Sequence, residues 1–380
     1  MPQRPLQAFR SIGRLILPMT LAAACADGTA TSPLVPARAS SATTPSTTAT
    51  VSVVMSGLDN PRGLGFAPNG ALYVTEAGNT TVNGACLTTP RGEICFSGTG
   101  AVTRLWKGQQ SRVISGLPSA VFPATSEVTG PQDIGFRGAA RAFVTIGWGG
   151  DPRGRSALGP NGLKLGNLFS FDLSGHSNYV ADIGAFEVAN NPAGGPIDSN
   201  PFGLLTEPTE QFVTDAGGNA LLRVSDGAVS TVATFGPIPV PAGPFNPPFT
   251  QSDPVPTRVS RGPDGALYVS VLTGVPFLPG AASIYRVVPG QAPTVFAGGF
   301  TTITDHAWDR GGSLYVLQFA SQPFLGGPGS VVRVDPNGTR TVIIATLTNP
   351  TGIAIGHDGG IFVANKGTQA GTGEVLRITP

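Results

Sequence analysis

Oxygen-bearing side chains recur at one position of a repeated pattern in this sequence. Glu76, Asp215 and Asn365 each stand three residues after an aromatic residue in an apolar stretch. Carboxylate and amide oxygens are the ligands that hard divalent cations such as Ca²⁺ prefer. The three residues are therefore our candidate metal ligands. Ile146 and Val271 hold the same position in other copies and leave the oxygen shell incomplete.

A second set of charged residues precedes the apolar stretches. Only 12% of the chain is charged, so this many charged residues at the two ends of the apolar stretches is an unusual concentration. We expect the residues that precede the stretches and those that end them to meet at the mouth of one channel. The candidate ligand-binding residues are Arg62, Glu76, Asp133, Trp148, Asp215, Arg258, Asp305, His306 and Asn365. Beside Asp305, the charged form of His306 is expected to be favoured, and its position would suit a base. No residue is assigned a catalytic role.

Three interpretations of these residues stay open. In the first, they cap strand ends, pair with one another and line a water-filled channel. In the second, they bind a small-molecule or peptide-like ligand, with insertions around residues 86–95, 147–167 and 237–256 as the wall. In the third, they hold the divalent cation of an enzyme. Trp148 either stacks on a ligand, covers the channel or packs in the core.

The pattern that would position these side chains occurs six times. Each copy has a Pro-led approach, an apolar stretch, a tight turn with Gly and a run such as Leu72-Tyr73-Val74. The aromatic residues of these runs are Tyr73, Phe143, Phe212, Tyr268, Tyr315 and Phe362. Two more β-type runs follow most copies, so each unit has four short antiparallel strands. Six such units predict an all-β, six-bladed β-propeller over residues 50–380.

The two ends of this predicted domain complement each other. Residues 352–378 supply only three strands, while residues 50–57 have the look of an outermost strand. We expect the N-terminal strand to close the last blade, because this removes an exposed sheet edge.

Composition narrows the class of partner. The chain has 23 Lys and Arg against 22 Asp and Glu, a formal charge of +1. That balance excludes electrostatic capture of nucleic acid or of an acidic membrane as the main function. We expect a monomer.

The N-terminus predicts export. Residues 1–24 combine three arginines with an apolar run that ends in three alanines, which is typical of a signal peptide. Cys25 follows directly, so it is either the lipidated residue of a bacterial lipoprotein or incidental to ordinary signal cleavage. Residues 25–49 are rich in Ser, Thr and Pro and predict a flexible tether. The protein is then a periplasmic or cell-envelope lipoprotein that meets the membrane only through its lipid, or a secreted protein.

Cys86 and Cys95 form the other cysteine pair, nine residues apart. In an exported chain this even pair predicts a disulfide, and two free buried cysteines are the alternative.

Residues 50–380 resemble the ScyD/ScyE-type propeller proteins, which are related more distantly to NHL-repeat and gluconolactonase-like propellers. The resemblance lies in the order of several motifs: Asn60-Pro61-Arg62-Gly63-Leu64, the cysteine loop, Gly130-Pro131-Gln132-Asp133-Ile134, Gly147-Trp148-Gly149-Gly150-Asp151-Pro152, Asp198-Ser199-Asn200-Pro201 and Asp215-Ala216-Gly217-Gly218-Asn219. It implies an exported propeller but fixes no activity. We expect a ligand-binding or scaffold module, and the gluconolactonase-like relatives suggest the alternative of a divalent-cation-dependent hydrolase or lyase.

Overall fold

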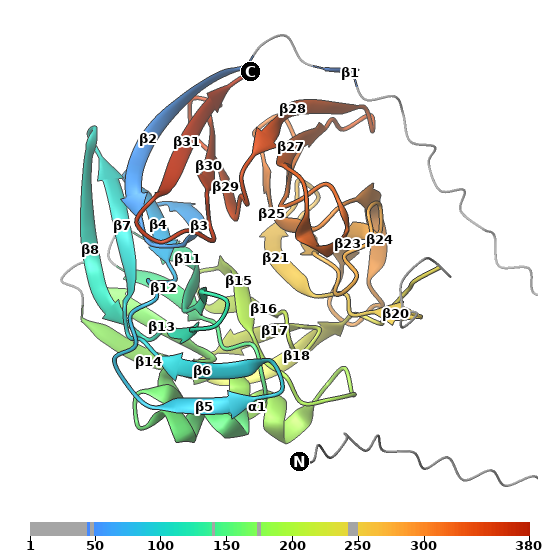
Figure 1. Ribbon diagram of the computed structural model, residues 1–380. Coiled ribbons are helices and arrows are strands. Elements are labelled where there is room, and N and C mark those ends of the chain that lie inside the picture. Colours follow the sequence, from blue (N-terminus) through green and yellow to red (C-terminus); the bar gives the residue numbers. More distant parts are fainter. Residues whose placement is uncertain (1–43, 46–48, 139–140, 173–175, 242–249) are drawn as a thin grey trace, which may run out of the picture. The chain divides into compact units, whose positions relative to one another are not determined.

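A computed structural model describes residues 44–45, 49–138, 141–172, 176–241 and 250–380. The predicted export signal, Cys25 and nearly all of the tether lie outside these residues. The described elements belong to a unit that spans residues 41–380 and is nearly all-β (Figure 1). No helix among the described residues is long and apolar enough to cross a membrane.

Six antiparallel meanders of four strands make up most of the fold. The first three consist of β3 (Pro61–Phe66), β4 (Leu72–Glu76), β7 (Gly100–Trp106) and β8 (Gln109–Leu117); β11 (Pro131–Arg137), β12 (Arg141–Ile146), β13 (Asn167–Asp172) and β14 (Ser177–Asp182); and β15 (Pro201–Thr206), β16 (Glu210–Asp215), β17 (Ala220–Ser225) and β18 (Ala228–Thr234). The next two consist of β21 (Pro256–Arg261), β22 (Leu267–Val271), β23 (Ala282–Val287) and β24 (Thr294–Phe300); and β25 (Ile303–Trp308), β26 (Leu314–Gln318), β27 (Gly329–Val334) and β28 (Arg340–Leu347), to which β1 (Thr44–Pro45) adds in parallel. The last consists of β29 (Gly352–Ile355), β30 (Ile361–Asn365), β31 (Gly373–Thr379) and β2 (Thr50–Leu58).

The second strand of each sheet carries the aromatic residue that the repeat predicted, and all six are at most 9% exposed. Residues that flank the aromatic on a strand point to the opposite face. Leu72 and Val74 flank Tyr73 and are also buried, so both faces of the sheet are covered. Hydrophobic clusters therefore form between consecutive sheets.

Tight turns built from the same residue types connect the first two strands of several sheets. Gly70, Gly265 and Gly359 have φ values of 84°, 77° and 81°, a conformation that other residues rarely adopt. The preceding Asn69, for example, accepts a hydrogen bond from the Ala71 amide at 3.0 Å. The Asn-Gly and Asp-Gly pairs thus fix the hairpins as the sequence indicated.

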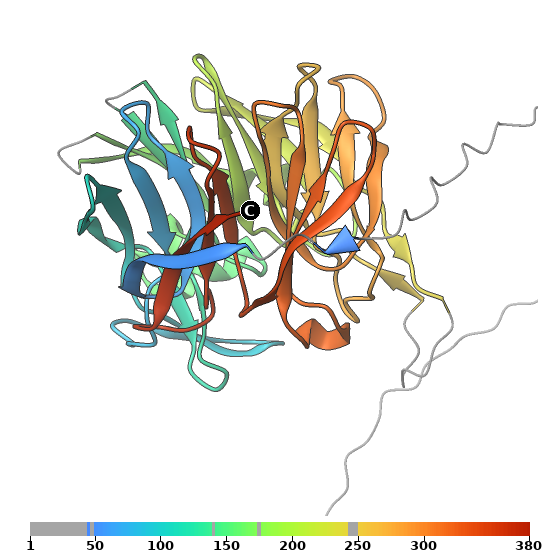
Figure 2. The same cartoon turned by 90° about the horizontal axis from the view of Figure 1, so that it is seen from above.

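The first strands of the six sheets contact one another in chain order, and β29 contacts β3 (Figure 1). Thr351 Oγ1 donates to the carbonyl oxygen of Pro61 at 2.8 Å, which joins the last sheet to the first. β2 pairs antiparallel with β31, as expected, and both views show the two strands side by side (Figures 1 and 2). Met55 and Leu58 of β2 then complete a hydrophobic cluster with residues of both the first and the last sheet.

The other elements lie in insertions between the strands of the six sheets. A further four-stranded sheet consists of β5 (Cys86–Thr89), β6 (Gly92–Phe96), β9 (Ala120–Phe122) and β10 (Glu127–Thr129). It contains the disulfide predicted between Cys86 and Cys95, which is confirmed. The remaining elements are the 3₁₀ helices η1 (Pro152–Leu158), η2 (Gly162–Lys164) and η3 (Pro323–Leu325), the helix α1 (Ile183–Asn190), and the two-stranded β19 (Ile238–Pro239) and β20 (Gln251–Ser252). The sequence did not predict α1, whose first turn is capped by Asp182 accepting from the Ala185 amide at 2.7 Å.

Candidate functional site

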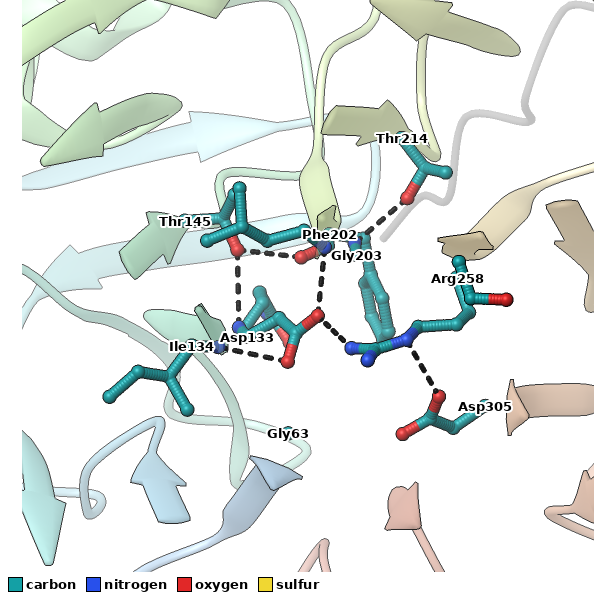
Figure 3. A network of polar contacts seen from close by, with 12 residues as sticks. Gly63, Asp133, Ile134, Thr145, Phe202, Gly203, Thr214, Arg258 and Asp305 are labelled. Carbon is teal, nitrogen blue, oxygen red and sulfur yellow. Dashed lines mark hydrogen bonds and ion pairs between the residues drawn. The ribbon is translucent and has the colours of Figure 1, made fainter. Parts of the chain in front are cut away.

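Three of the predicted charged residues meet where the first strands come together. In each first strand one residue pairs with a valine of the second strand, and the residue just before it holds an equivalent position in every sheet. The residues at this position are Gly63, Asp133, Gly203, Arg258, Asp305 and Gly352. Arg258 from β21 forms ion pairs with Asp133 from β11 and Asp305 from β25 (Figure 3). The structure thus brings together Asp133, Arg258 and Asp305 from three sheets.

Backbone amides hold the two carboxylates in place. Asp133 accepts from the amides of Ile134 and Leu204, both at 2.8 Å (Figure 3). Asp305 accepts from the amides of His306 at 2.7 Å and Ile353 at 2.8 Å. Each aspartate therefore ties its own first strand to the first strand of the next sheet.

Glycines make room for this arrangement. A Cβ on Gly63 would lie 2.3 Å from Asp133 Oδ1, and one on Gly203 would lie 2.7 Å from the Arg258 Cα. No side chain fits at such distances, so glycine lets the Asp133 carboxylate pass Gly63 and lets the backbone of Arg258 approach Gly203.

Burial controls the ionisation of this cluster. It raises the pKa of Asp305 to about 7, with Arg258 opposing and Asp133 reinforcing the shift. Burial likewise raises the pKa of Asp133 against the opposing effect of Arg258. Both aspartate side chains are only 4% exposed and the Arg258 side chain 18%. The cluster is almost closed to solvent, and its opposite charges pair with one another.

The three candidate metal ligands share a different local role. Each ends a second strand and accepts a hydrogen bond from the amide of a residue that precedes the first strand of its own sheet. The pairs are Glu76 with Asp59 (2.7 Å), Asp215 with Asn200 (2.6 Å) and Asn365 with Thr348 (2.8 Å), and Gln318 does the same with Thr301 (2.6 Å). These side chains are caps that hold the entry to each sheet.

Their remaining oxygens are also engaged. Glu76 accepts from Thr103 Oγ1 at 2.5 Å and pairs with Arg112, whose Nη2 lies 2.5 Å from Oε2. Asp215 Oδ1 accepts from three amides and Oδ2 accepts from Ser199 Oγ at 2.7 Å. A divalent cation would have to displace these donors and overcome the charge of Arg112, so Glu76, Asp215 and Asn365 do not fit the proposed metal. Among the described residues, the one group of three His, Cys, Asp or Glu with closely spaced ligand atoms is Cys86, Glu93 and Cys95, whose cysteines are oxidised.

Arg62 lies apart from the central cluster. Its guanidinium donates to the carbonyl oxygen of Val128 at 2.9 Å and to that of Gly367. Burial lowers the pKa of Arg62 to about 10, with Glu127 opposing. Arg62 joins the insertion sheet to the loop after β30.

The expectation that His306 lies at the channel mouth in its charged form is wrong. Successive residues of a strand face opposite ways, so His306 points away from Asp305 and is fully buried. Its Nε2 lies 2.6 Å from Ser260 Oγ, which accepts from Trp308 Nε1 at 3.1 Å, and its Nδ1 lies 3.1 Å from Ser270 Oγ. Both ring nitrogens of His306 therefore lie within hydrogen-bonding distance of a serine hydroxyl, which can donate or accept. Burial and the positive charge of Arg258 lower the pKa of His306 to about 3.

Trp148 belongs to a different site. Its side chain is 2% exposed and packs in the core between the first two sheets. It also lines a cavity of about 430 Å³, together with residues of the cysteine hairpin, β9, the loop after β12, η1 and the loop before β15. The apolar lining includes Leu87, Ile94 and Phe122, and the polar lining includes Arg91, Asp151 and Asp198. Two of the three predicted insertions therefore wall a cavity, and the third, 237–256, contributes no residue to it in the part that the structure describes.

Sequence reasoning missed two carboxylates near this cavity. Asp198 lines it, and Glu187 of α1 is 2% exposed. Burial, followed by the charges of Asp215 and Asp198, raises the pKa of Glu187 to about 7. Burial also raises the pKa of Asp198, and that of Asp215 to about 6. Two signals were available: Asp198 stands in one of the motifs that carry the resemblance, and Glu187 is an acid within the apolar run Ala185-Phe186-Glu187-Val188-Ala189.

The fold defines the class of protein: the chain is a β-propeller. Among solved structures it is similar to a protein of unknown function from Bacteroides thetaiotaomicron, with a TM-score of 0.54 and 10% identity over 87% of this chain and 76% of that one. It is also similar to a gluconolactonase from Xanthomonas campestris, with a TM-score of 0.51 and 12% identity over 87% of this chain and 89% of that one. At these identities the likeness concerns the fold alone. Comparison with protein families and with curated sequences finds no match.

Proposed function

We propose that this chain is an exported six-bladed propeller of the ScyD/ScyE type that binds a small molecule in the cavity beside Trp148. Residues 1–24 would be its signal, Cys25 its lipid anchor, residues 25–49 its tether and residues 50–380 the binding domain, which acts as a monomer. The cycle of contacts among the six first strands supports a closed ring of six blades.

One observation carries the binding role. The Trp148 cavity combines apolar walls with two polar atoms that have no hydrogen-bond partner, Trp148 Nε1 and Asp198 Oδ1. Concave, mostly apolar cavities with a few convergent polar groups are the usual form of small-molecule sites. Buried polar atoms are nearly always paired, so a ligand that supplies both an acceptor and a donor would complete these two.

The central cluster supports binding less well. Asp133, Arg258 and Asp305 are paired with one another and with backbone amides, and they are almost fully buried. We assign them to holding the sheets together.

A ligand screen with a cavity-filling variant tests the proposal. A Cβ on Gly150 would meet only Trp148, at 3.5 to 4.0 Å, which is ordinary contact. Gly150→Leu should therefore fold and fill the space in front of Trp148. We expect ligand-observed NMR to find neutral, anionic or cationic fragments that bind the wild type and not Gly150→Leu. Binding that is equal in both proteins would contradict the proposal, as would a screen without any binder.

The alternative of a divalent-cation-dependent hydrolase or lyase predicts a different outcome. EDTA would lower the melting temperature of the purified domain, and Ca²⁺ would restore it. We expect no change, because Glu76 and Asp215 are already satisfied by protein donors.

A further inference from the structure

Three carboxylates gather around the dipeptide Gly217–Gly218. A Cβ on Gly217 would lie 2.5 Å from Asp198 Oδ1, and a Cβ on Gly218 would lie 2.9 Å from Glu187 Oε2 and 3.1 Å from Asp215 Oδ2. The absence of side chains at both glycines allows the carboxylates to approach from α1, from the loop before β15 and from the end of β16. Negative charge is thereby concentrated at one edge of the Trp148 cavity, which Asp198 lines.

This charge lacks a counter-ion within the described part of the chain. Ion pairs there involve neither Asp198 nor Glu187 nor Asp215. Asp198 Oδ1 and Glu187 Oε1 are buried and have no hydrogen-bond partner. Arg91 also lines the cavity and acts electrostatically on Asp198, but its guanidinium is already paired with Glu127 at 2.7 Å. The Ser199 amide also favours the charged form of Asp198, but burial outweighs both effects and raises the pKa. A largely buried carboxylate without an ion pair is costly, so a cation is the favoured complement.

A hydrogen-bond donor lies at the same end of the cavity. Gly150, which is close to the Trp148 indole nitrogen, pairs with Ser199, the neighbour of Asp198 in sequence. The pairing brings the loop after β12 beside the loop before β15. Trp148 Nε1 is buried without a partner, and an indole N–H is satisfied only by an acceptor. The carboxylate requires a donor and the indole an acceptor, so the ligand must carry both.

We propose that this cavity binds a compound with a primary ammonium group and a neighbouring carbonyl oxygen on an apolar skeleton, as in an amino-acid amide or the N-terminus of a peptide. The ammonium group would pair with Asp198, the carbonyl oxygen would accept from Trp148 Nε1, and the apolar side chain would lie against Leu87, Ile94 and Phe122. The inference rests on the proposed function of the cavity and names its ligand class.

Calorimetric titration with phenylalanine amide tests the inference. Three analogues each change one feature: N-acetylphenylalanine amide loses the charge, 3-phenylpropanamide loses the amine and 2-phenylethylamine loses the carbonyl. We expect each analogue to bind about tenfold more weakly or worse, the amount that one lost polar interaction of about 1.4 kcal/mol gives. A tripeptide Phe-Gly-Gly distinguishes the two sources of this chemistry, because it binds as well as the amide only when the cavity accepts a continuing chain.

Matched variants locate the interaction. Asp198→Asn retains the size of the side chain and should weaken phenylalanine amide about tenfold or more, whereas Trp148→Phe should weaken it while abolishing its preference over 2-phenylethylamine. Asp358→Asn changes an exposed acid of another sheet and should leave binding unchanged. Melting curves establish that each variant is folded. If Asp198→Asn does not fold, the analogue series on the wild-type protein still tests the inference.

The two proposals can fail separately. If phenylalanine amide binds no better than its acetylated analogue, or binds Asp198→Asn equally well, the ligand class is wrong. If neutral or anionic fragments nevertheless bind the wild type and not Gly150→Leu, the binding function stands without it. If no fragment binds, both are wrong.

Discussion

The guanidinium of Arg258 reaches the carboxylate of Asp133 across an intervening sheet. Asp133 belongs to the second sheet in chain order and Arg258 to the fourth, and the third sheet has Gly203 at the corresponding position. The ion pair therefore depends on a missing side chain as much as on the two charges. It ties together strands that are not neighbours in any sheet.

Removing Arg258 should destabilise the protein strongly. Arg258→Met leaves Asp133 and Asp305 buried without their cation, and breaking a buried ion pair in this way costs about 3 to 5 kcal/mol. The free energy of unfolding from urea denaturation measures the loss. Arg377→Met breaks an exposed pair with Asp358 and should cost less than about 1 kcal/mol. Equal losses in the two variants would show that the central ion pairs do not hold the sheets together.

Acid should destabilise the protein through His306. Its pKa of about 3 in the folded state lies below the ordinary value of 6.5, so the unfolded chain binds the proton more readily between these values. The stability that neutral His306 provides is present above about pH 6.5 and is lost as pH falls toward 3. Compared with His306→Gln, the wild type should lose about 1.4 kcal/mol of stability per pH unit in this window. Urea denaturation of both proteins from pH 7 to pH 4 gives the comparison. Asp305 and Arg258 are present in both proteins, so their contributions cancel in the difference. Parallel pH profiles would rule out a buried neutral imidazole.

Glu187 should have the opposite pH dependence. Its pKa of about 7 is raised from the ordinary 4.5, so the stabilising effect of the protonated form is present below about pH 4.5 and disappears as pH rises through 7. Glu187→Gln removes the buried charge. At pH 8 it should raise the free energy of unfolding by about 1 to 2 kcal/mol, and the melting temperature with it. At pH 5 the substitution should have little effect. A variant that is destabilised equally at both pH values would indicate that Glu187 has a partner in solution.

Removing the N-terminal strand should open the fold. Without residues 50–58 the backbone of β31 becomes an exposed sheet edge, and the buried Met55 and Leu58 are lost from the cluster between the first and last sheets. We expect a large fall in melting temperature and a tendency to aggregate, measured against a chain that begins at Ser41. A truncated chain that melts like this control would mean that β2 is dispensable.

The repeat made the strands predictable because each second strand carries its own aromatic residue, from Tyr73 to Phe362. The pairing of β2 with β31 was predictable because the last unit lacked one strand. The direction in which individual side chains point was less predictable from the sequence. Asp305 and His306 are adjacent in sequence, but the strand turns one toward Arg258 and the other into the core between sheets. Glu76 looked like a ligand because its partner Arg112 is 36 residues away, on the fourth strand of the same sheet. Such long-range partners leave no local pattern in the sequence.

The pairing of β2 with β31 also sets an order for biosynthesis. β2 leaves the ribosome before the other strands of the six meanders, and its partner β31 follows them. While the intervening sheets are synthesised, the apolar face of β2 has no partner strand, and contacts between such distant segments form slowly. A nascent chain of this design completes its last sheet only after β31 has emerged, so its sheets are most exposed to misassembly and to chaperones before that point.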